Sequence, residues 1–439
     1  MPPAVAVAAG GFFSLQDERL ALGSEGYSPG MLKKIEYAGG NQRSFACAAE
    51  SLERLAECSI SVRHVERVTE RLGKERAARR DKQATLMKER KRRSQYKQPP
   101  AVAVVMLDAG KAQFRQENAG PGVHGPRWGD VKTACLQTYS DVTYDRDPQP
   151  EPPAAFLDPA RVERLCREME RVRGSGGEEK RQDSDKTKTK DRDKTKSKAR
   201  KRKKTKAKDR RKSSRRLVRT VVATVAGVEE FGGQVSAEAM SRKFYGAKKR
   251  AVMGDGANWI DPPGQMHFPD WIAILDFLHL LVHLFAAARL TYVHDARAAW
   301  TLYEKMLRDA WSGKVEQVIA ALKSQLRRLQ SARAAAPDTW RVVELALGYV
   351  ESNRERMDYP RYRKLGLPVS SSLVESLIKQ INLRVKGTEQ FWNDGGLEAV
   401  LQVRAAYLSQ DDRAETLHKN RPRGPAVGRN RAKLLKVAG

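Results

Sequence analysis

The sequence predicts an α/β protein in which a mixed-sheet core is interrupted by a helical insertion and preceded by a helical domain. Short valine-rich runs alternate with helical patterns between residues 99 and 296, as strands and helices do in an α/β core. From residue 277 to about 347, apolar residues recur at helical spacing. A chain of 439 residues is long enough for two or three domains.

Residues 28–98, which follow an N-terminal extension at 1–27, are predicted to form a helical domain with a basic connector. Each of three helical patterns begins at a serine, a favoured N-cap residue. These serines are Ser28, Ser44 and Ser61. The turn CSIS joins the second and third helices, as in a helix-turn-helix, and the third helix is basic. Its candidate DNA contacts are Arg63, Arg67 and Arg71. The alternative is a small helical bundle with a solvated basic face.

The first half of the core is predicted at residues 99–145, as three strands in an antiparallel meander. The run AVAVVMLD is apolar and reads as a buried strand that ends at Asp108. The runs KAQFRQE and VKTACLQTYS follow as two further strands, separated by a stretch rich in glycine and proline.

Residues 146–216 are predicted to leave the core, as one linker helix followed by a disordered basic loop. The run from 180 to 216 holds 21 Lys and Arg against five Asp, a net charge of +16. Because it has no apolar residue larger than alanine, it cannot bury enough surface to fold. It serves either as a solvated linker or as a DNA-gripping segment.

The rest of the chain returns to a globular pattern. The second half of the core is expected at 217–296, with strand-like runs that end at Asp255 and Asp276. A helical insertion is expected at 297–368 and a helix that carries Glu375 at 369–410. A loose basic tail is expected at 411–439.

The charge balance points to a polyanionic partner. The chain has 83 Lys and Arg against 53 Asp and Glu, a net charge of +30, which favours phosphate contacts and makes nucleic acid the leading partner. No apolar run of about 18 residues lacks a charge, so no membrane partner is expected. The four cysteines are far apart and form no CxxC pair, which favours a reducing compartment. We therefore expect a cytoplasmic protein.

Three carboxylates stand out. Asp108 and Asp255 each end a short apolar strand, and side chains at adjacent strand ends can converge on a hard cation such as Mg²⁺. The alternative for either one is a turn aspartate beside glycine. Glu375 lies on a helix whose same face carries Lys379, although a capping box from Ser372 also explains a glutamate there.

The segment DFLHLLVH places His279 and His283 one helical turn apart. A zinc protease is excluded because Leu280 stands where the HExxH signature needs its general base. We expect instead that His279 is hydrogen-bonded to the nearby Asp276.

Taken together, VVMLDAGK, GDGANWI, HFPDWIAILDFLH and VSSSLVESLIKQINLRVKG resemble bacterial insertion-sequence DDE transposases of the Mutator-like superfamily. The family's catalytic and metal-binding triad maps onto Asp108, Asp255 and Glu375, and its D-x-x-H signature onto Asp276 and His279. A common form of the last motif has Gly-Ser-Gly where this chain has three serines at 370–372. The resemblance implies an RNase H-like core.

The resemblance also implies a function. The triad would bind two Mg²⁺ or Mn²⁺ ions and catalyse DNA cleavage and strand transfer at terminal inverted repeats. The partners would be the element's double-stranded DNA ends and target DNA, and the protein would act as a homo-oligomer on DNA, associated with a bacterial nucleoid. The residues expected to contact phosphates near the site are Arg361, Arg363, Lys379, Arg384 and Lys386. The alternative is a catalytically inactive or repurposed DNA-binding protein.

Overall fold

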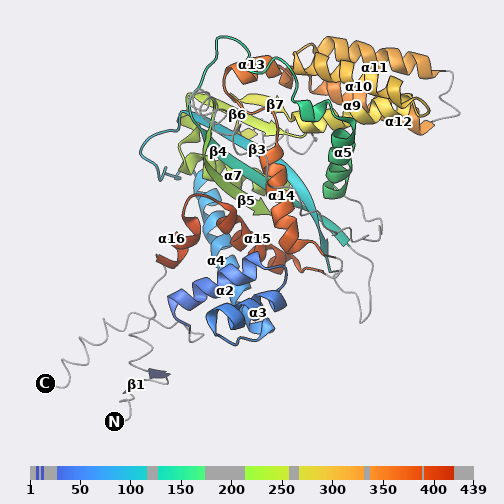
Figure 1. Cartoon of the computed structure of the whole chain (residues 1–439). Coiled ribbons are helices and arrows are strands. Elements are labelled where there is room, and N and C mark those ends of the chain that lie inside the picture. Colours follow the sequence, from blue (N-terminus) through green and yellow to red (C-terminus); the bar gives the residue numbers. More distant parts are fainter. Residues whose placement is uncertain are drawn as a thin grey trace, which may run out of the picture.

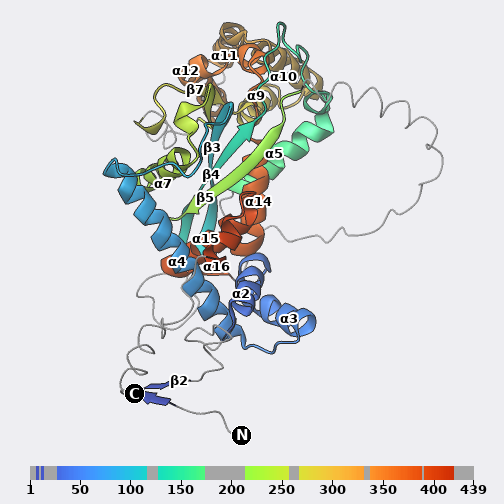
Figure 2. The ribbon, with the colours of Figure 1, turned by 90° about the vertical axis from the view of Figure 1, so that its left-hand side faces the viewer.

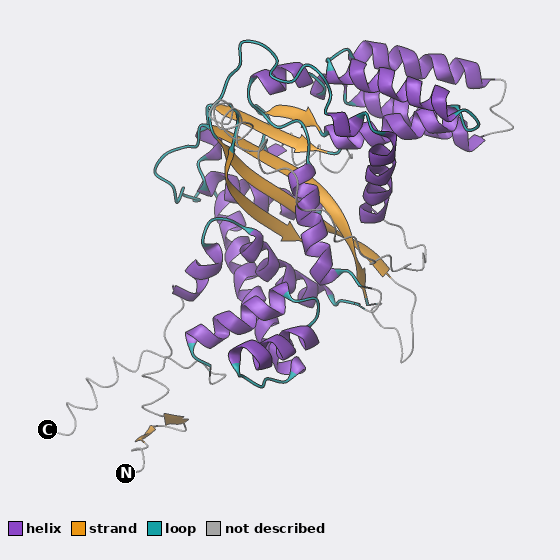
Figure 3. Ribbon diagram, in the orientation of Figure 1, coloured by secondary structure: helices purple, strands orange, loops and turns teal. Residues whose placement is uncertain are grey.

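A five-stranded mixed sheet lies at the centre of the α/β fold (Figure 1, Figure 3). The computed structural model describes residues 27–115, 127–169, 213–256, 266–330, 337–387 and 390–419, and the backbone alone of 6–8, 11–13 and 170–173. The strands are β3 (Val102–Phe114), β4 (Arg127–Tyr139), β5 (Arg216–Thr224), β6 (Lys249–Gly254) and β7 (Ile272–Leu275). Their order in the sheet is β5-β4-β3-β6-β7. The first three strands are antiparallel, whereas β6 and β7 run parallel to β3. A separate short ladder pairs β1 (Ala6–Ala8) with β2 (Gly11–Phe13).

Residues 99–145 form two long strands, so the prediction of three was wrong. β3 continues past Asp108 and pairs with β4 without a break, from Val102 opposite Tyr139 to Phe114 opposite Arg127. Gly110 is the glycine near Asp108 on which the alternative of a turn depended, and it instead allows helix α14 (Ser372–Val385) to pack closely. A Cβ at Gly110 would lie 3.2 Å from Ile378 Cγ2.

Both faces of the sheet are buried, and side chains alternate between them as strand geometry requires. Ala103, Val105 and Leu107 join a core with helix α7 (Val228–Ser241). Val104 and Met106 join the larger core with α14 and α15 (Asp394–Leu408), on the side where α5 (Pro159–Arg173) also lies (Figure 2). By the same alternation Asp108 points toward the α14 side.

Four helices fill the stretch where helical periodicity was expected, and they lie at one end of the sheet (Figure 1). They are α9 (Phe277–Thr291), α10 (Ala296–Trp311), α11 (Val315–Leu329) and α12 (Pro337–Ser352). The chain returns to the sheet through the short helix α13 (Tyr359–Lys364). Within the described residues, no helix combines the length and the apolar character that crossing a bilayer requires.

The N-terminal helices are α2 (Pro29–Asn41), α3 (Phe45–Ala56) and α4 (Val62–Lys88). Each helix begins where its serine predicts. The hydroxyl oxygens of Ser28, Ser44 and Ser61 each accept a hydrogen bond from the backbone N of the residue three positions later. The three helices share a small core that includes Ile35 and Val65. α4 then continues as a single long helix that packs against α7 and α15 (Figure 2).

The contact between α4 and α15 depends on Gly73. A Cβ at this position would lie 2.1 Å from Ala399 O, a backbone atom that cannot move aside without moving the helix. We expect Gly73→Ala to lower the free energy of unfolding by about 1–3 kcal/mol. Gly348→Ala is the matched control, because a Cβ on this helical glycine of α12 meets no atom within 4 Å. Urea unfolding of both variants tests the contact, and equal stability of the two would contradict it.

The predicted loose tail begins instead with an ordered helix, α16 (Arg413–Lys419). It is held by contacts that the sequence does not reveal: Asp411 forms an ion pair with Arg242, and His418 Nε2 lies 2.6 Å from the buried Glu36 of α2. The rest of the predicted tail, 420–439, and the lysine-rich run up to residue 212 lie outside the described residues.

Candidate metal centre

Asp108 and Asp255 occupy matching positions along two neighbouring parallel strands, with Asp255 just after the end of β6. The register pairs Met106 of β3 with Met253 of β6, and each aspartate lies two residues beyond its methionine. Both side chains are buried, with 6% of Asp108 and 8% of Asp255 exposed. Asp108 also accepts a hydrogen bond of 2.7 Å from Ala109 N. The expected convergence of these two carboxylates is therefore found, although Asp108 lies within its strand and not at the end.

The helical insertion holds the backbone next to Asp255. Tyr349 of α12 donates its hydroxyl proton to Asp255 O at 2.7 Å. Gly256, the next residue, has a φ of +75°, and a Cβ there would lie about 3 Å from Tyr349, Asn353 and Leu275. This glycine is thus required by the local backbone and by packing.

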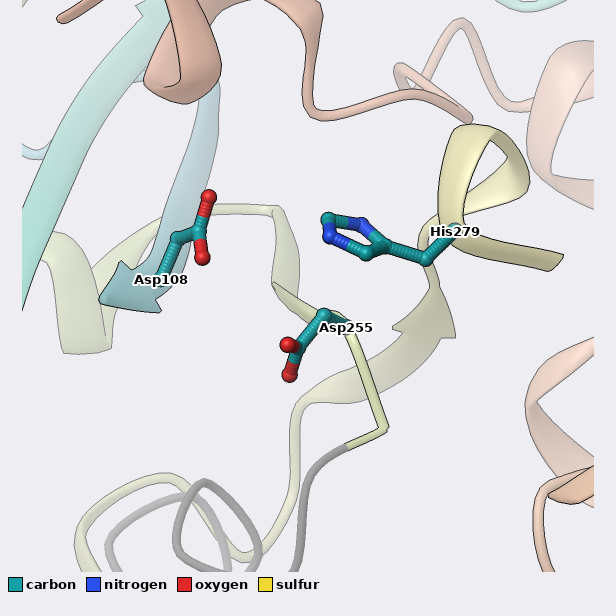
Figure 4. Close-up of side chains that lie close together, drawn as sticks. All are labelled: Asp108, Asp255 and His279. Carbon is teal, nitrogen blue, oxygen red and sulfur yellow. The ribbon is translucent and has the colours of Figure 1, made fainter. Parts of the chain in front are cut away.

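His279 lies on the first turn of α9 and is the third side chain of this site. Its ring points toward Asp108 and Asp255 (Figure 4). Asp276 caps α9 by accepting from Leu278 N at 3.3 Å and His279 N at 3.2 Å, and it also bonds His279 Nδ1. The predicted pair of Asp276 and His279 is confirmed. His283 stacks instead on Tyr349, with ring centroids 4.0 Å apart.

Glu375 reaches the site from the first turn of α14. Its Oε1 lies 3.0 Å from Ser371 Oγ, and Ser371 is in turn bonded to Asp276. The capping box from Ser372, which was the alternative explanation of Glu375, is not formed, because Ser371 occupies the N-cap position. Lys379, on the same face of the helix, does not pair with Glu375, since Lys379 Nζ lies 2.7 Å from Glu168 of α5.

Potential ligand atoms form two groups that share His279. One group contains Asp108, Asp255 and His279, and the other contains Asp276, His279 and Glu375; within each, the ligand atoms lie within 4.8 Å of one another. Among the described residues, Glu375 therefore belongs to a different group from Asp108 and Asp255, and His279 is common to both groups.

The site concentrates acidic groups in a buried environment. Burial raises the pKa of Asp108 to about 7; His279 opposes this rise, whereas Asp255 and Glu375 add to it. Burial and the neighbouring Asp276 raise the pKa of Glu375. Burial also acts on Asp276, but hydrogen bonds from His279 and Ser371 outweigh it, so the pKa of Asp276 is lowered. Repulsion among buried carboxylates is relieved by a bound divalent cation, so these residues fit Mg²⁺ or Mn²⁺.

The predicted DNA contacts divide into exposed and buried residues. Arg63, Arg67 and Arg361 are exposed. Arg67 also contacts a neighbour, with its Nη2 2.7 Å from His64 Nδ1. Three other residues keep exposed surface and contact other side chains. Arg71 pairs with Glu75 at 3.0 Å, Lys379 pairs with Glu168, and Lys386 lies 5.3 Å from the Trp128 ring.

Arg363 and Arg384 are buried, so the prediction that they contact phosphates was wrong. Arg363 binds both oxygens of Asp147 and lies 4.2 Å from the Trp311 ring. Arg384 donates to Gly39 O at 2.8 Å, and its guanidinium lies 4.5 Å from the Phe45 ring and 5.2 Å from the Trp392 ring. Burial lowers the pKa of Arg384 to about 10, and Arg404 adds to this effect. Both arginines connect elements of the fold.

Sequence reasoning missed Ser371 and Tyr349 as parts of the site. The three serines before Glu375 marked the place, but no pattern distinguished the middle one. The sequence did not indicate a role for Tyr349, because the pattern there is that of an ordinary amphipathic helix. A scan of the sequence against protein-family models finds no match, and a search of curated proteins finds none either.

Proposed function

We propose that this chain is a DDE-type DNA transposase that cleaves an insertion sequence at its terminal inverted repeats and joins the ends to target DNA. The observation that carries the proposal is the placement of Asp108 on β3 and of Asp255 directly after the adjacent parallel strand β6, with Glu375 reaching the same region from α14. It is tested by metal-dependent nicking and joining of DNA that carries the element's ends.

The fold is consistent with the RNase H-like core that the resemblance implies. Asp108 lies on the middle strand of a five-stranded mixed sheet, Asp255 follows the neighbouring strand, and Glu375 lies on a helix that packs over β3. The helical layer interrupts the chain between β7 and α14, where the resemblance implies an insertion.

Asp108, Asp255 and Glu375 would hold the divalent ions. When bound, two Mg²⁺ or Mn²⁺ ions would supply Lewis-acid activation of a water or 3′-hydroxyl nucleophile and stabilise the leaving oxygen. The chain itself contributes a rigid, water-poor frame: Asp108 is fixed by the sheet, Asp255 by Tyr349, and Asp276 orients the His279 ring through Nδ1.

The α2–α4 domain would bind the element's end as a helix-turn-helix. Arg63 and Arg67 are exposed near the start of α4, the helix that would read DNA. We expect the double substitution of both residues by alanine to weaken binding and to lower the salt dependence by about one ion per lost phosphate contact. Binding of a terminal-repeat duplex at several salt concentrations measures both quantities.

The double substitution of Arg297 on α10 and Arg341 on α12 by alanine is the matched control, because both arginines are exposed but belong to the insertion. An equal loss of affinity in the control would show that overall charge, and not this face of α4, determines binding. The protein's action as a homo-oligomer on paired ends remains part of the proposal.

A further inference from the structure

Ser371 connects the two acidic groups of the candidate site. Its backbone N donates to Asp276 Oδ1 at 2.6 Å, and its hydroxyl lies 2.7 Å from Asp276 Oδ2 and 3.0 Å from Glu375 Oε1. The residue is 3% exposed. Its position is therefore fixed by the backbone bond, and its side chain has little room to turn away from either carboxylate.

The contacts of Ser371 tie together the starts of two helices. Asp276 caps α9, while Glu375 N bonds Ser371 O at 3.0 Å in the first turn of α14. A second link runs from Phe277 N to Val369 O at 3.1 Å. Through these bonds the helix that carries His279 and the helix that carries Glu375 share one anchor. A shift at Ser371 would move Glu375 relative to His279.

We propose that Ser371 is a positioning residue, which fixes the Glu375 carboxylate against Asp276 and so sets the affinity of the site for a divalent cation. The inference rests on the proposed function, because it takes Glu375 to be a metal ligand. A hydroxyl has one proton, so Ser371 donates a hydrogen bond to one carboxylate at a time. The other carboxylate is held next to the same hydroxyl. Partners that orient metal ligands typically contribute tenfold or more to metal affinity.

The three consecutive serines provide matched controls. Ser370 and Ser372 flank Ser371, but their hydroxyl groups are 3.4 Å from each other in an exposed contact. Neither of them is bonded to Asp276 or Glu375 in any contact that the described residues show. Removal of each hydroxyl in turn therefore separates the role of Ser371 from general effects of the serine run.

The test is direct titration of the full-length, DNA-free protein with Mn²⁺. We expect Ser371→Ala to weaken Mn²⁺ binding by about 10-fold or more. Ser371→Thr, which keeps the hydroxyl, should bind close to the unmodified protein, and Ser370→Ala and Ser372→Ala should bind as it does. Thermal unfolding without metal checks that each variant is folded. In cleavage assays, raised Mn²⁺ should restore Ser371→Ala but not Asp255→Asn.

The possible outcomes separate this inference from the proposed function. If Asp255→Asn loses Mn²⁺ affinity while Ser371→Ala keeps it, Ser371 does not position a ligand and the metal centre stands. An equal loss in Ser370→Ala would also overturn the role of Ser371. If the unmodified protein and Asp255→Asn bind Mn²⁺ equally, or neither binds, the metal centre itself is wrong, and the inference fails with it.

Discussion

Asp255→Asn is expected to reduce metal-dependent DNA cleavage by about 10³-fold or more, since loss of a metal ligand removes several kcal/mol of transition-state stabilisation. Asparagine is nearly isosteric with aspartate and keeps one oxygen. The backbone of Asp255 is held separately by Tyr349, so the fold should survive. Cleavage of terminal-repeat DNA in Mn²⁺, together with thermal unfolding, measures both effects.

Asp108→Asn should abolish cleavage in the same way and have an additional effect on stability. Because burial raises the pKa of Asp108 to about 7, the ionised carboxylate is unfavourable in the metal-free fold at higher pH. The metal-free variant should therefore be at least as stable as the unmodified protein at pH 8. Asp270→Asn, at an exposed position, is the control that should keep full cleavage. Cleavage retained by either site variant would remove that aspartate from the proposed centre.

The largest loss of stability is expected from Glu36→Ala. The Glu36 carboxylate is completely buried and is bonded by Arg76 at 2.6 and 2.9 Å and by His418 at 2.6 Å. Its removal leaves Arg76, whose side chain is 9% exposed, without its buried partner. Breaking such a pair lowers the free energy of unfolding by about 3–5 kcal/mol. Urea unfolding at neutral pH measures this loss.

The pH dependence of the free energy of unfolding provides a second test of the role of Glu36. Burial acts to raise the pKa of Glu36, but the bonds from His418 and Arg76 outweigh it and lower the pKa below its ordinary value of 4.5. A lowered pKa contributes stability above pH 4.5 that is lost as the pH falls through the folded value. The difference in free energy of unfolding between Glu36→Ala and the unmodified protein should therefore become smaller in acid. Glu53→Ala, at an exposed position of α3, should show neither effect.

Local patterns in the sequence predicted those features that depend on neighbouring residues. Ser28, Ser44 and Ser61 predicted helix starts because a hydroxyl near the first turn satisfies a free backbone N–H, whatever the rest of the fold does. The Asp276 and His279 pair was predictable for the same reason, since the two residues are only three positions apart, at the start of one helix.

Features that depend on distant parts of the chain were not predictable. Gly110 looked like a turn because nothing local shows that α14 will pack over it. Arg363 looked like a phosphate contact, but its partner Asp147 lies more than 200 residues away in the sequence. The convergence of Asp108 and Asp255 was expected, but the register of β3 and β6 that produces it could not be derived from local patterns.

The most direct measurement of the central claim is a nicking assay on DNA that carries the element's terminal inverted repeats, performed with Mg²⁺ or Mn²⁺ and with a chelator. If Asp108, Asp255 and Glu375 form one metal-dependent centre, the unmodified protein nicks the element end, leaves a 3′-hydroxyl, and does so only when the ion is present. Salt-sensitive binding of the same DNA without a nick in either metal, or nicking that persists in the chelator, would contradict the account.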